Sequence, residues 1–251
     1  MEVTLEQVMT PRSFRPSSDF KIYTKSEEGY IVDSGGQDIT VAMSTMNSMA
    51  GLQVEHLSKT NGAVDQYKFT LDSSIPLKDG DRVHFKLPEE LSLALRVECR
   101  AADPPVGALA VSCSGVDKSV WVNLDELDRE TGKFEFVVDG IKNAPSFRET
   151  GSFSEVYMQT SDFFSIQKLD SHDHLTVTND QVALITEYEQ IQDTEQYGEK
   201  GAYDLRFTPL NPISSDGTVK LTWSSDVEVF ADAKCRVETY AALGEICEID
   251  F

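Results

Sequence analysis

An internal repeat constrains this chain more strongly than any other feature of its sequence. The segment PRSFRPSSDF at 11–20 returns as APSFRETGSF at 144–153, an offset of 133 residues. Residues 67–85 return as residues 203–221, at an offset of 136. The matched positions include apolar, turn and cysteine residues: Phe20 and Phe153, Tyr67 and Tyr203, Pro76 and Pro212, and Cys99 and Cys235. Because a nearly constant offset through such different residue types is typical of a duplicated unit, we infer two copies of one module.

Short runs of alternating or β-branched residues fill both copies. They are bounded by turn signals such as Asn-Gly and Asp-Gly, a pattern typical of antiparallel β-sandwiches. We therefore predict an all-β chain of tandem antiparallel β-sandwich domains of the immunoglobulin-like kind. Alternation places Phe134, Phe136 and Val138 on one face of a strand, which we expect to lie in the core. The polar segment 188–200 is predicted to form a loop or a single helical turn.

The two copies are out of phase with the ends of the chain. The first copy continues past Cys113 through two more strand-like runs, whereas the second stops soon after Cys247. Residues 2–14 align with residues 135–147, so the chain opens with what should be a terminal strand. The apolar positions of this opening strand are Val3, Leu5 and Val8.

The positions of the two copies relative to the ends of the chain predict three segments. Residues 1–10 form a strand that belongs to a preceding or neighbouring unit, and residues 11–140 form the first immunoglobulin-like repeat. Residues 141–251 form the second repeat, which lacks its last strand or strands, and a short link around 139–146 limits interdomain motion. Either the chain is a window from a longer tandem array, or residues 2–8 complete the last domain of another copy by strand donation. Donation of this kind would build a head-to-tail filament.

The four cysteines divide two and two between the copies. The recurrence of a closely spaced pair predicts one disulfide per domain, Cys99–Cys113 and Cys235–Cys247, although four cysteines allow three connectivities. Reduced, buried cysteines are the alternative, and the lack of a Cys-x-x-Cys spacing disfavours zinc. Because structural disulfides persist in oxidising compartments, we expect an extracellular or cell-surface location.

Charge and hydropathy exclude some partners. The chain holds 43 acidic and 22 basic residues, a net charge of −21, so it has no basic footprint for nucleic acid. No apolar run approaches the ~20 residues that span a bilayer, so we expect no membrane insertion. The opening MEVTLEQV has neither the basic nor the apolar part of a signal peptide, so an extracellular chain would be a processed or excised form.

The motifs of the common enzyme classes are missing from the sequence. It has no nucleophile elbow, zinc-protease motif or glycine-rich nucleotide loop, so we predict no enzymatic activity and no cofactor. The loop LDELDRE offers carboxylates of a kind that Ca²⁺ prefers, on Asp125, Glu126, Asp128 and Glu130. Because the loop lacks an EF-hand spacing, we expect it to be a solvated acidic loop, with a Ca²⁺ site as the alternative.

The histidines indicate little chemistry. On a strand, His172 and His174 would share a face and suit a metal pair, but a polar turn is the expectation for this segment. His84 aligns with Lys220 of the second copy and is therefore predicted to lie at the surface.

The repeated motif resembles a repeat of large surface proteins of protists, ciliates especially. The motif is PRSFRPSSDFKIYT, which returns as APSFRETGSFSEVYM after the strand KFEFVVDGIKN. In those proteins, a strand ending in Gly-x-x-Asn-Pro leads into a Ser-Phe motif, and paired cysteines follow. Here the Asn-Pro position holds Asn143-Ala144-Pro145 and, in the first copy, Thr10-Pro11. The resemblance implies tandem immunoglobulin-like extracellular modules without catalytic activity.

Together these features predict a non-enzymatic extracellular protein with a structural or adhesive role. Its modules would form a surface array or a self-assembling filament, and its partners would be other copies or neighbouring repeats. A recognition module that binds glycan or Ca²⁺ through acidic loops is the alternative.

Overall fold

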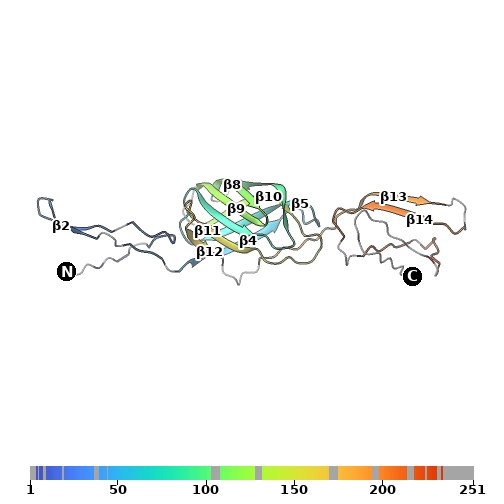
Figure 1. The fold of residues 1–251 in the computed structure, drawn as a ribbon, viewed down its shortest axis with the longest axis horizontal. Helices are drawn as coiled ribbons and strands as arrows, with labels where there is room; N and C mark the ends of the chain where they lie inside the picture. Colours follow the sequence, from blue (N-terminus) through green and yellow to red (C-terminus); the bar gives the residue numbers. More distant parts are fainter. Residues whose placement is uncertain are drawn as a thin grey trace. The chain divides into compact units, whose positions relative to one another are not determined.

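A computed structural model gives the fold of the chain (Figure 1). It describes residues 4, 6–7, 10–18, 20–36, 40–43, 45–102, 108–127, 132–169, 175–193, 198–213, 218–223, 225–230 and 233. The named elements in this part of the chain are all β-strands, as predicted. None of the residues described forms a helix long and apolar enough to span a membrane. The chain divides into two compact units, Met1–Ala183 and Leu184–Phe251.

A four-stranded antiparallel sheet forms one layer of a β-sandwich in the first unit. Its order is β4-β5-β10-β7, with bounds Gly51–His56, Val64–Ser73, Gly132–Lys142 and Ser92–Ala101. Along β5, buried and partly buried residues alternate because successive side chains of a strand point to opposite faces. Tyr67, Phe69 and Leu71 therefore all point into the core, and each is fully buried.

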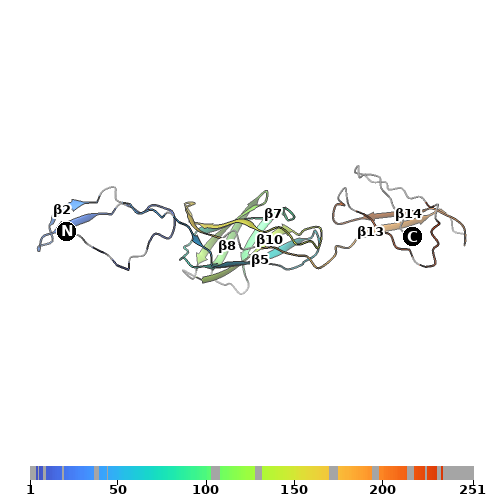
Figure 2. The ribbon, with the colours of Figure 1, turned by 90° about the horizontal axis from the view of Figure 1, so that it is seen from below.

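A six-stranded sheet forms the other layer (Figure 2). Its order is β3-β12-β11-β6-β9-β8, with bounds Asn47–Ser48, Ser165–Lys168, Ser154–Gln159, Asp81–Lys86, Ser119–Leu127 and Ala108–Val116. Within the part of the chain described, β3 and β12 form the one parallel pair of named strands. The other named pairs are antiparallel, as expected for a sandwich of this kind.

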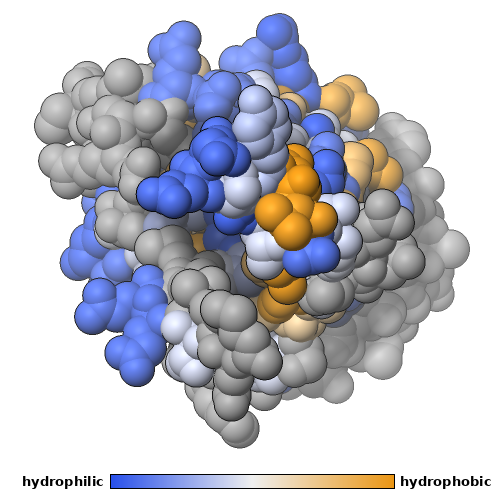
Figure 3. Space-filling model, turned by 90° about the vertical axis from the view of Figure 1, so that its left-hand side faces the viewer, coloured by the Kyte–Doolittle hydropathy of each residue, from blue (hydrophilic) through white to orange (hydrophobic). Residues whose placement is uncertain are grey.

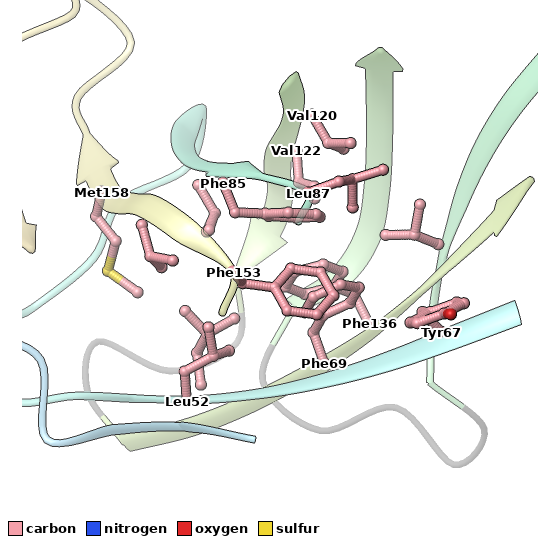
Figure 4. Close-up of a cluster of buried hydrophobic side chains, with 14 of the residues drawn as sticks. Leu52, Tyr67, Phe69, Phe85, Leu87, Val120, Val122, Phe136, Phe153 and Met158 are labelled. Atoms are coloured by element: carbon pink, nitrogen blue, oxygen red, sulfur yellow. The ribbon is translucent and has the colours of Figure 1, made fainter. Parts of the chain in front are cut away.

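Aromatic side chains from both sheets meet in the core (Figure 4). The ring centroid of Phe69 lies 4.5 Å from that of Phe85 on the opposite sheet and 5.2 Å from that of Phe136 on its own sheet. Phe153 closes the group with its ring edge-on to Phe69 at 5.8 Å. Phe134, Phe136 and Val138 are all buried, which confirms the core face predicted for their strand. Aromatic pairs in such geometries add stability beyond the area that they bury.

A glycine allows β10 to bend between its two neighbouring strands. Gly140 has a φ of +94°, and the pairing register of β10 shifts between Asp139 and Ile141 toward both neighbours. A Cβ atom at this position would lie 2.3 Å from the backbone oxygen of Arg96. Only glycine fits such a left-handed position pressed against another backbone.

Two further hairpins complete the named elements. In the first unit, β1 (Ile22–Lys25) pairs with β2 (Ile31–Gly35). In the second unit, β13 (Thr186–Gln192) pairs with β14 (Tyr203–Thr208). The prediction of a loop or helical turn at 188–200 is therefore wrong for its first part. All seven residues of β13 are exposed, so burial imposes no alternation on its sequence.

The division between the units differs from the boundary predicted at 140/141. Strands β11 and β12 lie beyond that boundary, yet β11 pairs with β6 in the middle of the six-stranded sheet. The first unit therefore extends to Ala183. The short interdomain link expected around 139–146 is instead the end of β10 followed by buried residues, since Asn143 and Ala144 are each 2% exposed.

Candidate functional site

The central feature of the sandwich is a segment from the second sequence copy that is built into the first unit. We call residues 146–177, which contain β11 and β12, the docked arm. Strand β11 pairs with β6 so that Tyr157 is opposite His84, Met158 opposite Val83 and Gln159 opposite Arg82. The docked arm contributes a set of side chains that are at most 5% exposed: Phe153, Val156, Met158 and Ile166. The sandwich core thus combines residues of both sequence copies.

A buried glutamine fixes the docked arm to its neighbours. Gln167 on β12 is fully buried, and its Oε1 accepts a hydrogen bond from Ser73 Oγ at 2.7 Å. Its Nε2 donates to Ser74 Oγ at 2.8 Å and to the Ser48 carbonyl at 3.2 Å. Because each polar atom of the amide is paired, its burial is compatible with a stable core and specifies how β12 sits against β3 and β5.

A second buried network lies where β10 leads into the docked arm. The Tyr67 hydroxyl donates to Asn143 Oδ1 at 2.6 Å, and Asn143 Nδ2 donates to the Thr60 carbonyl at 2.9 Å. Burial, reinforced by the negative charge of Asp65, raises the pKa of Tyr67 far above its ordinary value of 10.0. The hydroxyl therefore stays protonated and remains a donor. Asn143 belongs to the Gly-Ile-Lys-Asn motif found in the sequence, and its role is to join β5 to the start of the docked arm.

The chain that leaves the docked arm is held by the end of β4, the loop after it and the segment that follows β10. His56 Nε2 donates to the Thr178 carbonyl at 3.1 Å, and Asn179 Nδ2 donates to the Ala144 carbonyl at 2.7 Å. The Lys59 carbonyl accepts hydrogen bonds from the backbone N–H groups of Asp180 and Gln181, each at 3.1 Å. Both ends of the docked arm are therefore anchored on the same end of the sandwich.

Residues 13–41, which we call the N-terminal arm, have the local structure of the docked arm. The hairpin turn of each arm is closed by a 2.8 Å backbone hydrogen bond, Ser26 N–H to the Tyr30 carbonyl and Thr160 N–H to the Phe164 carbonyl. Both turns hold a residue with left-handed φ at the equivalent position, Gly29 in one and Phe163 in the other. The strand registers agree at an offset of 134: Tyr23–Ser34 with Tyr157–Lys168, Thr24–Asp33 with Met158–Gln167, and Lys25–Ile31 with Gln159–Ser165.

In both arms, the same two hydrogen bonds join the start of the arm to its end. Ser17 N–H donates to the Val41 carbonyl at 2.8 Å, and Val41 N–H donates back to Ser17 Oγ at 2.8 Å. Thr150 and Val177 exchange the same two hydrogen bonds, at 3.0 and 3.1 Å. The extra residue between Phe153 and Tyr157 is accommodated by a β-bulge, in which Glu155 has a φ of +51°. The arms therefore match in structure even where their sequence offset changes.

The two arms differ in what covers their apolar side chains. Phe20, Ile22 and Val32 of the N-terminal arm are 47%, 62% and 63% exposed. The equivalent Phe153, Val156 and Ile166 of the docked arm are 3%, 5% and 3% exposed. Figure 3 shows one face of the molecule on which apolar side chains lie exposed among hydrophilic ones.

The hairpin of the second unit copies the register of β4 and β5 from Glu189 to Gln192. Gln192 is opposite Tyr203 and Glu189 is opposite Arg206. At an offset of 136 these pairs correspond to others in the first unit, His56 opposite Tyr67 and Gln53 opposite Thr70. Over these residues the hairpin of the second unit therefore has the pairing of β4 and β5.

A disulfide joins the two sheets of the sandwich. Cys99 on β7 is bonded to Cys113 on β8, with the two Cα atoms 5.5 Å apart, which is the pairing predicted for the first copy. Both strands are edge strands, one of each sheet, so the bond links the layers along one side. Other predicted site residues lie outside the described part of the chain: Cys235, Cys247, Val3, Leu5 and Val8.

The candidate metal ligands are only partly described. Asp125 and Glu126 lie near the end of β9, and the Glu126 backbone N–H donates to Asp79 Oδ1 at 2.7 Å. The described residues contain no group of three or more His, Cys, Asp or Glu side chains able to hold a metal ion. The remaining candidates lie outside that part of the chain: Asp128, Glu130, His172 and His174.

Sequence reasoning missed a row of aromatic side chains on the outer face of the six-stranded sheet. His84 lies between Tyr157 and Trp121 on the neighbouring strands, with ring centroids 4.5 and 4.9 Å away. Its Nδ1 lies 2.9 Å from the Glu155 carbonyl. The prediction of a surface position for His84 is therefore wrong, since the flanking rings leave it 3% exposed. The next row of this face is polar and contains Gln159, Arg82, Asn123 and Ser112.

No known protein family matches the sequence, and no curated protein matches it significantly. Two solved structures are similar to about half of the chain. One is a non-cellulosomal cohesin from the hyperthermophilic archaeon Archaeoglobus fulgidus, with a TM-score of 0.30 and 10% identity over 49% of this chain and 94% of its own. The other is the chitin-binding domain of a hyperthermophilic chitinase from Pyrococcus furiosus, with a TM-score of 0.27 and 14% identity over 49% of this chain and 98% of its own.

Proposed function

We propose that this chain is a non-enzymatic extracellular structural protein of tandem β-sandwich modules, each completed by the start of the next repeat. The observation that carries the proposal is the docked arm. Its sequence repeats that of the N-terminal arm, yet β11 lies between β12 and β6 in the sheet of the preceding module. Consecutive repeats that share a core in this way cannot separate without breaking a sheet.

The arrangement suits a protein that transmits force or fixes spacing between modules. A pull on the chain beyond Ala183 acts on the docked arm, which is held by the pairing of β11 with β6 and by the buried amide of Gln167. The disulfide between Cys99 and Cys113 holds the two sheets together on the opposite edge. A disulfide that closes a loop of this length contributes about 3 kcal/mol in the chain-entropy model.

Hydrogen exchange on the full chain tests the shared core. We expect the amides of β11 and β12 to exchange with the same opening free energy as those of β5 and β10, because all four strands belong to one cooperative core. Fast exchange in β11 and β12 beside a protected β5 and β10 would show that the arm is only loosely attached, against the proposal.

Antibody labelling of the source cells tests the extracellular location. We expect an antibody against the chain to label intact cells, and electron micrographs of the native material to show a surface layer or filaments. Protein isolated in the presence of an alkylating agent should carry no label on Cys99 or Cys113. Labelling that requires permeabilised cells, together with alkylated Cys99 and Cys113, would contradict the location.

The aromatic row on the outer sheet face favours glycan recognition as a second candidate function. Trp121 and Tyr157 offer ring faces for the C–H surface of a sugar, while Arg82 and Asn123 of the adjacent row can hydrogen-bond its hydroxyls. A glycan array probed with the full chain tests this candidate. We expect Trp121→Ala to abolish binding there and Trp223→Ala to leave it unchanged. Equal loss of binding in both variants, or no binding at all, would exclude this face.

A further inference from the structure

The N-terminal arm carries the apolar face of a docked arm, but no sheet covers it in the part of the chain that the structure describes. Ile22 and Val32 are both more than 60% exposed, although the equivalent side chains of the docked arm are buried in the core. The backbone of the arm already has the registers and turn of the docked form. Burying Ile and Val side chains is favourable, so the exposed face favours association.

We propose that the N-terminal arm docks on the second unit of another copy of this chain, in the register that the docked arm uses on β6. The inference rests on the proposed function, because it extends the completion of a module by the next repeat to completion between molecules. The sequence predicted donation of a single strand, residues 2–8. Here the donated element is the whole hairpin of β1 and β2.

The second unit offers the matching receptor residues. On β14, Tyr203, Leu205 and Phe207 stand where β5 has the core residues Tyr67, Phe69 and Leu71, at the common offset of 136. At the same offset, residues 218–222 correspond to 82–86 of β6, the strand on which β11 docks, and Trp223 corresponds to Leu87 directly after it. Their apolar members are exposed instead of buried: Val219 is 50%, Leu221 is 51% and Trp223 is 37% exposed.

The offsets define the register of the complex. The docked arm places Tyr157, Met158 and Gln159 opposite His84, Val83 and Arg82 of β6. Transferred to the equivalent positions, Tyr23 lies opposite Lys220, Thr24 opposite Val219 and Lys25 opposite Thr218 of the other copy. Thr24 and Val219 then face the core. Tyr23 and Lys220 lie on the outer face of the sheet, which is where the equivalent Tyr157 and His84 lie in the first unit.

Cysteine cross-linking tests the register. In the double variant Tyr23→Cys/Lys220→Cys the two cysteines are directly opposite, at a Cα separation of about 4.5–5.5 Å that a disulfide can bridge. In the control Tyr23→Cys/Thr222→Cys they are diagonal neighbours about 7–8 Å apart, beyond that range. We expect ladders of disulfide-linked chains on a non-reducing gel from the first variant only. Equal ladders from both variants, or a cross-link confined to single chains, would overturn the proposal.

Light scattering with size-exclusion chromatography tests the driving force. We expect the full chain to associate in a concentration-dependent way, and more strongly in 0.5 M than in 0.05 M NaCl, because salt screens repulsion between copies of charge −21. Ile22→Asp and Val32→Asp should each raise the dissociation constant at least tenfold. Leu95→Asp, on a fully exposed side chain of β7, should leave it unchanged.

A chain that remains monomeric up to 100 µM, or whose association is unaffected by Ile22→Asp, would overturn the docking. Such a result would leave the proposed function in place if the exchange of β11 and β12 still follows that of β5. The two proposals can therefore fail separately.

Discussion

The hydrogen bond between Tyr67 and Asn143 offers a sharp test of how the docked arm is joined to the sandwich. Replacing Asn143 by Ala leaves the fully buried Tyr67 hydroxyl without this acceptor and removes one of the two donors to the partly buried Thr60 carbonyl, which keeps the backbone N–H of Ala63. An unsatisfied buried polar group costs about 1–3 kcal/mol and a lost hydrogen bond about 0.5–1.5 kcal/mol, so we expect Asn143→Ala to lower the free energy of unfolding by about 2–4 kcal/mol. Tyr67→Phe leaves only the acceptor Asn143 Oδ1 without this donor, at a cost of about 1–2 kcal/mol.

The double variant separates the shared bond from independent effects. In Asn143→Ala/Tyr67→Phe the orphaned hydroxyl no longer exists, so the combined loss should fall short of the sum by about 1–3 kcal/mol. Urea unfolding followed by tryptophan fluorescence measures each variant. The chain has two units and need not unfold in one step. The variants are therefore made in a Trp223→Phe background, in which the fluorescence comes from Trp121 in the sandwich alone.

The surface residue Asn123 provides the control. Its side chain donates to Ser112 Oγ on an exposed face, so Asn123→Ala should change the stability by no more than about 0.5 kcal/mol. Losses for Asn143→Ala and Tyr67→Phe that add within about 0.5 kcal/mol would refute the reasoning, because the two side chains would then contribute independently.

Three further outcomes follow from the sandwich. Removing the disulfide with Cys99→Ser/Cys113→Ser should lower the free energy of unfolding of the sandwich by about 3 kcal/mol, and dithiothreitol should destabilise the sandwich of the parent chain but not that of the variant. The folded-state pKa of Tyr67 is raised above its ordinary value. The contribution of its protonated hydroxyl to the free energy of unfolding is therefore complete below pH 10 and is lost as the pH rises further. Alkaline urea titrations should therefore show a smaller loss of stability in Tyr67→Phe. Gly140→Ala should cost about 2 kcal/mol or more by calorimetry, because its Cβ meets the Arg96 backbone; a neutral effect would contradict the tight approach.

The core residues that sequence reasoning found lie on strands with one buried face. Along β5 and β10, alternation of apolar and polar residues follows from the pleat, and the core residues could be predicted from it. Strands β4 and β13 escaped prediction because their sequences, GLQVEH and TEYEQIQ, show no clean alternation. They occupy equivalent positions of the two copies, so the repeat itself was the signal that could have located both.

The candidate site was less predictable than the strands. The disulfide between Cys99 and Cys113 followed from the spacing of the cysteines in both copies. The network of Tyr67 and Asn143 did not, because it joins residues 76 positions apart. His84 was misplaced for the same reason: its burial depends on Tyr157 and Trp121, which reach it from two other strands.

The sequence by itself determined that the chain is built of strands, since alternation and turn chemistry are local. The nearly constant offset predicts that one module recurs in the chain. Only the tertiary structure decided where one module ends. The two arms have the same hairpin, yet Val156 is buried and Ile22 is exposed. A hairpin specifies its own register, but its burial depends on a sheet edge far away in the chain. For β11 that edge is β6, so the sandwich of the first unit closes with strands beyond the boundary predicted at 140/141.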